Sequence, residues 1–74
     1  MQKFKVSIVV EKNKNGYYAY CPELQGCYSQ GDTYEEAVEN IRDAIKLHIE
    51  DRLEQGEEIQ QSEITSIANI EVAV

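Results

Sequence analysis

The amino-acid sequence predicts an α+β fold, a single β-β-β-α-β domain with one long helix packed on a four-stranded sheet. Two patterns lead to this prediction. Apolar and polar residues alternate at 3–11 and again at 70–74, with the two-residue period of a strand that buries one face. From 34 to 53, apolar residues recur at spacings of three and four, as in an amphipathic helix. A chain of 74 residues is long enough for only one domain, residues 1–74.

The first strand is expected over residues 3–11, whose even-numbered apolar positions share one face. Val9 interrupts the polar face, so we expect this strand to be partly covered on both sides and to lie inside the sheet instead of at its edge. Asn15 and Gly16 follow a polar stretch, and their tolerance of positive φ predicts a hairpin to the second strand.

The second strand is expected over 17–21 and stops at Pro22, because proline has no N–H to donate to a strand partner. A corner follows, in which Leu24 should plug the end of the sheet. The third strand is expected over 26–30, before Gly31 and Asp32 turn the chain again. Three antiparallel strands should therefore precede the helix.

Thr33 and Glu36 predict the start of the helix, since their spacing is that of a capping box. Gly56 is the expected C-terminal stop. Leu47 falls outside the apolar stripe, which predicts an exposed leucine, with contact to a second subunit as the alternative. Residues 57–66 are polar without a period and predict a loop, and 70–74 should then form a last strand within the sheet.

The formal net charge is −7, from 14 acidic and 7 basic residues. Its distribution is uneven, because residues 32–58 hold ten acidic residues against three basic ones. An acidic surface repels phosphate and attracts basic proteins. We therefore expect no direct binding of nucleic acid, and the charge permits a basic protein partner. The alternative is that these charges only solvate one helix face.

No apolar run approaches the roughly 20 residues that span a bilayer, and Met1 to Lys3 lead into the first strand without a signal-peptide core. We therefore expect no membrane association and a cytoplasmic location. Cys21 and Cys27 are then expected to be reduced thiols, with a disulfide as the alternative in an oxidising compartment.

No catalytic residue, metal ligand or cofactor is predicted. Metal-dependent nuclease chemistry needs several converging carboxylates, and the first strand offers only Glu11, at its end. Cys21, Cys27 and His48 match no common zinc-ligand spacing and lack a fourth ligand. We expect core thiols, a partly buried hydrogen-bonded histidine and a chain that is not an enzyme.

Tyrosines on neighbouring strands are the first candidates for contact with a partner. They alternate between the two faces, so at least one pair should lie on the side away from the helix. Tyrosine is enriched at interfaces because it buries area and keeps a polar tip, although cross-strand packing alone would also explain these residues. The candidates are Tyr17, Tyr18, Tyr20 and Tyr28.

Acidic residues on the outer face of the helix are the electrostatic alternative for binding a basic partner. They are Glu39, Asp43, Glu50 and Asp51.

Two motifs at a fixed separation give the chain a family resemblance. The segment Cys-Pro-Glu-Leu-Gln-Gly-Cys at 21–27, followed by Gly-Asp-Thr-Tyr-Glu-Glu-Ala at 31–37, resembles the HicB-like antitoxin family. In that family, an acid-containing Pro-x-Leu-x-Gly corner precedes a Gly-Asp-Thr-x-x-Glu-Ala helix start. The helix residues 39–41 and 43–45 also resemble the family's Glu-Asn-x-x-x-Ala-Ile run. Each motif residue has a mechanical role in a corner, turn or cap, so none is assigned as reactive.

The resemblance implies a partial ribonuclease-H-like fold, in which the last strand lies beside the first. It also implies a type II toxin-antitoxin partner, a small, basic, HicA-like RNase that cleaves mRNA and whose active site the antitoxin covers. We expect a homodimer or homotetramer. Many HicB proteins carry a C-terminal DNA-binding module that binds the operator, whereas this sequence resembles the short form. For the short form we expect neutralisation of the toxin without repression at the operator. The alternative is an orphan oligomeric domain that binds another protein or a small ligand.

Overall fold

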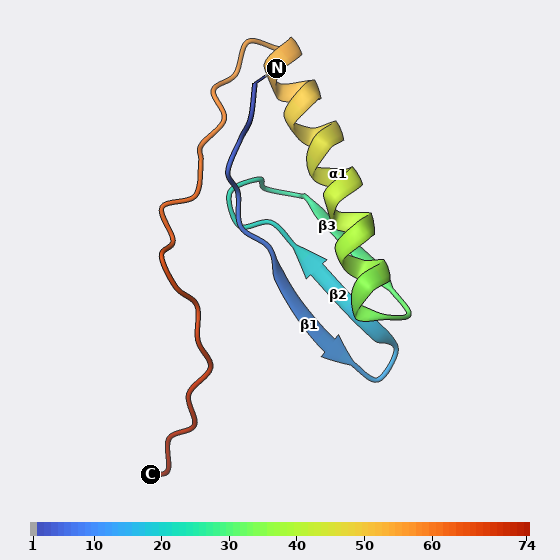
Figure 1. Ribbon diagram of the computed structural model, residues 1–74, viewed down its shortest axis with the longest axis vertical. Helices are drawn as coiled ribbons and strands as arrows, with labels where there is room; N and C mark the ends of the chain where they lie inside the picture. Colours follow the sequence, from blue (N-terminus) through green and yellow to red (C-terminus); the bar gives the residue numbers. More distant parts are fainter. Residues whose placement is uncertain (1) are drawn as a thin grey trace.

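The computed structural model describes residues 2–74 and contains three antiparallel strands followed by one long helix (Figure 1). The sheet order is β1-β2-β3, so β2 is central and β1 and β3 are edges. The helix lies across one face of the sheet and mainly over β3 and β2. The elements are β1 (Val9–Asn13), β2 (Gly16–Tyr20), β3 (Tyr28–Gly31) and α1 (Tyr34–Glu54).

The first strand differs from the prediction in extent and position. Pairing begins only at Val9, and residues 2–8 form an extended segment outside the sheet ladder. Phe4, Val6 and Ile8 are half-buried and pack against the core, so the alternation correctly identified their inward face. The predicted interior position was wrong, because β1 pairs only with β2 among the described strands. An alternating pattern shows that a face is buried, but not how many strands flank it.

The predicted hairpin joins β1 to β2, with Lys14 and Asn15 in the turn and Asn13 paired with Gly16. The Asn13 side chain accepts a hydrogen bond from the N–H of Asn15 at 2.8 Å. Gly16 has φ +127°, and a Cβ at this position would lie 2.7 Å from the carbonyl oxygen of Gly31. Only glycine fits both the conformation and the space.

Both predicted helix boundaries are confirmed. Thr33 is the N-cap, and its hydroxyl accepts the N–H of Glu36 at 3.0 Å. The Glu36 carboxylate accepts the N–H of Asp32 at 3.3 Å. In a standard capping box it would accept the N–H of the N-cap residue, which here is Thr33. At the other end, Gly56 takes a positive φ of +77° and donates its N–H to Leu53, which ends the helix.

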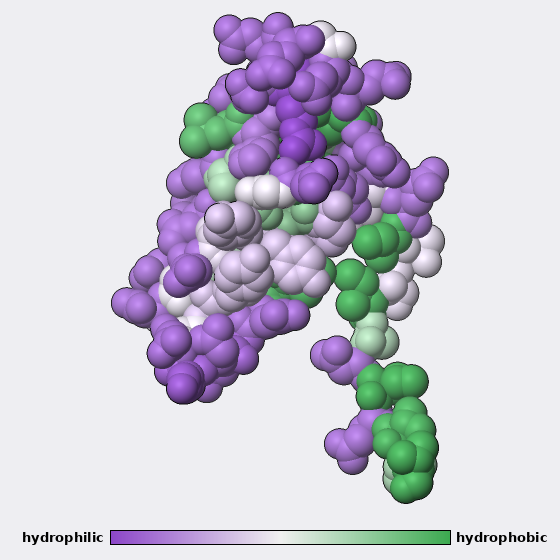
Figure 2. Space-filling view, turned by 180° about the vertical axis from the view of Figure 1, so that it is seen from behind, coloured by the Kyte–Doolittle hydropathy of each residue, from purple (hydrophilic) through white to green (hydrophobic). Residues whose placement is uncertain are grey.

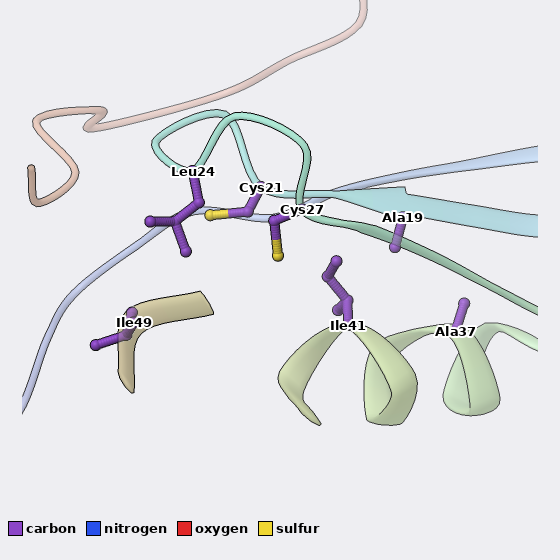
Figure 3. Close-up of a cluster of buried hydrophobic side chains, with 7 residues drawn as sticks. All are labelled: Ala19, Cys21, Leu24, Cys27, Ala37, Ile41 and Ile49. Carbon is purple, nitrogen blue, oxygen red and sulfur yellow. The ribbon is translucent and has the colours of Figure 1, made fainter. Parts of the chain in front are cut away.

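Buried side chains from the corner, from β2 and from α1 form one apolar cluster (Figure 3). The helix starts very close to β3, where a Cβ on Gly31 would lie 2.5 Å from the backbone nitrogen of Ala37. Ser29 in β3 donates its hydroxyl to the Ala37 carbonyl at 3.2 Å, which fixes this contact. The buried residues are Ala19, Cys21, Leu24, Cys27, Ala37, Ile41 and Ile49.

Cys21 and Cys27 join the two ends of the corner. The Cys21 N–H donates to the Cys27 carbonyl at 3.1 Å, and the Cys27 N–H donates to the Leu24 carbonyl at 3.1 Å. Both cysteines are free and buried, as predicted. Burial raises the pKa of both thiols, so they remain protonated at neutral pH. Their contribution is to packing.

The predicted fourth strand is not part of the sheet in the described chain. Residues 57–74 have no regular secondary structure, although Ile59 packs against the core. The Ser62 N–H donates to the Lys5 carbonyl at 2.8 Å, and the chain then runs clear of the body (Figure 1). The sheet therefore has three strands instead of four, and no last strand lies beside the first. The alternation at 70–74 indicates a strand, but it cannot specify which strand would pair with it.

The placement of Leu24 at the closed end of the sheet can be tested by truncation. Leu24 is 1% exposed and Leu47 is 67% exposed, so the same change removes buried packing at one site only. Leu24→Ala should lower the free energy of unfolding by about 2–5 kcal/mol, whereas Leu47→Ala should change it by less than about 0.5 kcal/mol. Urea denaturation followed by circular dichroism measures both. Equal losses in the two variants would contradict the placement of Leu24.

Candidate functional site

Three tyrosines form a continuous aromatic cluster on the sheet face away from α1. Tyr20 in β2 pairs with Tyr28 in β3, and Tyr18 lies two residues before Tyr20 on the same face. The Tyr18 ring centroid lies 6.0 Å from that of Tyr20 and 6.1 Å from that of Tyr28. Tyr28 is 59% exposed, and Tyr18 and Tyr20 are half-buried. The helix lies on the other face of the sheet (Figure 1). Because Tyr18 and Tyr20 alternate with the buried Ala19, their rings face outward.

The residues around these rings complete a surface that we call the tyrosine face. Val9 and Glu11 of β1 stand opposite Tyr20 and Tyr18, and Gln30 of β3 is paired with Tyr18. From behind, weakly polar side chains gather in the middle of the body, with hydrophilic side chains around them (Figure 2). The tyrosine face thus consists of Val9, Glu11, Tyr18, Tyr20, Tyr28 and Gln30. Among these six residues, Glu11 is the single charged one.

Tyr17, the fourth tyrosine proposed from the sequence, lies on the opposite side of β2. Its ring meets the ring of Tyr34 edge-on, with centroids 6.4 Å apart and an interplanar angle of 85°. This geometry is favourable for two aromatic rings and connects β2 to the first turn of α1. The structure therefore brings three of the four tyrosines together and places Tyr17 against the helix.

The helix acids form a second, separate surface. At about 100° per residue, Glu39, Asp43 and Glu50 fall on one side of α1, opposite the buried stripe. All three are exposed, and Lys46 lies on the same side and reduces their combined charge. Asp51 is turned away from them and accepts a hydrogen bond from Gln55 at 3.2 Å. The acidic helix side and the tyrosine face lie on opposite sides of the molecule.

The described residues contain no arrangement that would support catalysis on a metal ion. Within 2–74, no three His, Cys, Asp or Glu side chains are grouped to hold one. His48 is half-buried on α1 and does not join Cys21 and Cys27 in such a group. In the same part of the chain, no helix combines the length and apolar character needed to cross a membrane.

Glu23 forms a polar junction between three segments, which the sequence did not reveal. Its carboxylate accepts the N–H of Ser7 at 2.7 Å, and the Ser7 hydroxyl lies 2.6 Å from that of Ser62. The Lys5 N–H donates to the Gln61 side chain at 2.6 Å beside this junction. The corner, the extended N-terminal segment and the residues after α1 are thereby held together. These partners are far apart in sequence, so no local pattern could identify the contact.

The net effect of these contacts is a pKa of Glu23 below the ordinary value for glutamate. Partial burial acts in the opposite direction and raises the pKa. It is outweighed by hydrogen bonds from the N–H of Ser7, from the backbone of Glu23 itself and from the side chains of Ser62 and Cys21. The folded chain therefore favours the carboxylate form.

Comparison with known proteins identifies the family. A family model described as a HicB-like antitoxin of a bacterial toxin-antitoxin system matches residues 4–73, nearly the whole chain. The chain belongs to the HicB-like antitoxin family. This membership implies a toxin as partner and argues against an enzymatic role. The resemblance carried by the corner and helix-start motifs is thus confirmed.

Relatives of similar length support the same assignment. A UPF0150 protein of Helicobacter pylori is 49% identical over 69 residues, covering 92% of this chain and 94% of the relative. The UPF0150 protein ssr1765 of Synechocystis is 41% identical over 64 residues, covering 85% and 81%. The UPF0150 protein Ta0767 of Thermoplasma acidophilum is 36% identical over 64 residues, covering 85% and 93%. No solved structure matches the chain significantly.

The Glu23 junction predicts a pH dependence of stability. Because the folded pKa lies below the unfolded value of about 4.3, the carboxylate contributes stability above that pH and loses it as pH falls through the folded value. Glu23→Gln should lower the free energy of unfolding at pH 7 and flatten its decline below about pH 4.3. Urea midpoints measured from pH 7 to pH 3 test this. Glu39→Gln removes an exposed helix carboxylate and should keep the wild-type decline, so identical profiles for the two variants would contradict the junction.

Proposed function

We propose that this HicB-like chain binds and neutralises a HicA-like, mRNA-cleaving RNase toxin by covering the toxin's active site with the tyrosine face. The observation that supports this most is the outward cluster of Tyr18, Tyr20 and Tyr28 on a sheet face without a helix. Family membership supplies the class of partner. The tyrosine cluster supplies a surface suited to binding a protein.

Tyrosines that are fixed on paired strands are well suited to bind a protein. The β2–β3 ladder holds their backbone, and contact between the rings limits their rotation. Less conformational entropy is therefore lost when a partner covers them than with long flexible side chains. The rings bury apolar area, and their hydroxyl groups can exchange hydrogen bonds with water for bonds with the toxin.

Electrostatics supports a basic partner and disfavours RNA on the same surface. The chain carries a net charge of −7, which attracts a basic RNase over a distance and accelerates encounter. The tyrosine face itself has one carboxylate and no lysine or arginine. Single-stranded RNA binds to aromatic platforms that also carry positive charge, which this face lacks. We therefore assign Glu39, Asp43, Glu50 and Asp51 to long-range attraction and the tyrosines to contact.

Truncation of Tyr28 tests the proposal directly. The toxin is to be sought as a small basic protein encoded by an open reading frame beside the gene for this chain. The wild-type chain should inhibit RNA cleavage by this toxin at stoichiometric amounts. Tyr28→Ala should weaken binding by about 30-fold or more, the effect expected for an aromatic residue at the centre of an interface. Calorimetric titration and an RNA-cleavage assay measure binding and inhibition.

Tyr34→Ala is the matched control. Tyr34 is 51% exposed, close to the 59% of Tyr28, but it lies on the helix side. Its removal should leave binding and inhibition within about 3-fold of wild type. If Tyr28→Ala binds as well as Tyr34→Ala, the tyrosine face is not the contact surface. If the neighbouring gene encodes no toxin and no complex forms, the chain is instead an orphan domain for another protein or ligand.

A further inference from the structure

The tail, which we define as residues 63–74, has the pattern of a strand but leaves its apolar side in solvent. Even-numbered positions share one side of an extended chain, and Ile70, Val72 and Val74 all fall on that side. Ile70 is 84% exposed and Val72 is 69% exposed. Figure 2 shows this hydrophobic stretch projecting away from the body. An exposed apolar segment with the pattern of a strand is suited to pairing with another strand.

The tail is poorly placed to pair with a strand of its own chain. Ser62 is held beside Lys5 and Ser7, and the tail then runs in the same direction as β1 (Figure 1). Suppose that the tail paired with its own first strand residue by residue from Ser62 onward. Asn13, the last residue of β1, would then lie opposite a residue near Asn69. Ile70 and the residues after it would run past the hairpin. Their apolar side would still be uncovered.

The described chain is more extended than a compact domain of its length. Its radius of gyration is 14.1 Å, whereas a compact domain of this length should have about 11 Å. The longest dimension is 47 Å, and the tail reaches beyond the hairpin along it (Figure 1). A single copy thus leaves its tail outside the compact body.

An apolar groove on the body has the complementary character. It lies between residues 2–8 and α1, with one hollow of about 470 Å³ and a second of about 480 Å³ that share Phe4 and Ile45. Val6 and Val38 line the first hollow, and Ile49 lines the second. The helix covers β3 and β2 and leaves this part open. Residues 2–8 beside the groove belong to no sheet ladder. The backbone of Lys5 is bonded to Gln61 and Ser62, and the N–H of Ser7 to Glu23. The alternate residues Phe4, Val6 and Ile8 direct their backbone groups to the other edge of this extended segment, where a further strand can pair.

Charge around the groove also matches the tail. The charged residues that line the two hollows are Lys5, Arg42, Lys46 and Glu50, an excess of positive charge on a chain that is acidic as a whole. The tail carries Glu63 and Glu71 and no basic residue. Opposite charges at the rim favour docking of the tail and its orientation.

We propose that two copies of this chain exchange their tails reciprocally. Residues 69–74 of each copy lie beside residues 2–8 of the other as a fourth strand, with Ile70, Val72 and Val74 in the groove. The exchange adds beside residues 2–8 the last strand that the alternating pattern at 70–74 predicts. It also covers two exposed apolar strands with one symmetric arrangement, as in domain-swapped dimers.

Photo-crosslinking distinguishes exchange from folding back within one chain. The photoreactive residue p-benzoylphenylalanine replaces Phe4, a conservative change in the groove. Labelled ¹⁵N chains and unlabelled chains are unfolded together and refolded before irradiation. Exchange predicts a crosslinked dimer in which a peptide carrying residue 4 is joined to a peptide from 64–74 of the other isotopic copy. Crosslinks to the tail within one chain, or dimers without tail crosslinks, would overturn the proposal.

Charge substitution on the two sides of the tail gives an independent test. Ile70→Glu places a carboxylate in the groove, whereas Asn69→Glu places the same group on the opposite side of the strand. In the absence of toxin, light scattering should show wild type and Asn69→Glu at twice the monomer mass. Ile70→Glu should raise the dissociation constant of the dimer at least about 10-fold. Equal dimerisation of all three, or a monomeric wild type, would overturn exchange without affecting the assignment of the tyrosine face.

Discussion

The contact between the start of α1 and β3 determines what the rest of the molecule can cover. Gly31 leaves no room for a Cβ beside Ala37, so the helix lies directly on the edge strand β3. From there it packs over β2 and barely reaches β1. One helix in this position closes the core around Leu24 and Ile41 and leaves two surfaces open. These are the tyrosine face behind the sheet and the groove beside residues 2–8.

Features that depend on neighbours in the sequence could be predicted. The caps at Thr33 and Gly56, the hairpin and the buried stripe of the helix all follow from local spacing and local backbone preference. The corner between the two cysteines could also be placed, because Pro22 cannot continue a strand ladder. Leu24, expected to plug that corner, is indeed buried.

Features that depend on distant contacts could not be predicted. The Glu23 junction joins residues separated by up to 55 positions, and nothing in the composition around Ser7 or Ser62 indicates it. The first strand appeared to be internal because its pattern reports burial on both faces, whereas the single chain makes it an edge. The tyrosines were identified as a group, but the assignment of Tyr17 to the helix side required the strand register.

The two proposed interactions occupy opposite sides of the sheet, so self-association and toxin binding should be independent. Native mass spectrometry of the antitoxin mixed with its toxin tests this account most directly. We predict two antitoxin copies with two toxins for the wild-type chain, and one of each for Ile70→Glu. The account would be contradicted if Ile70→Glu failed to bind toxin at all, or if toxin binding separated the wild-type dimer into single antitoxin copies.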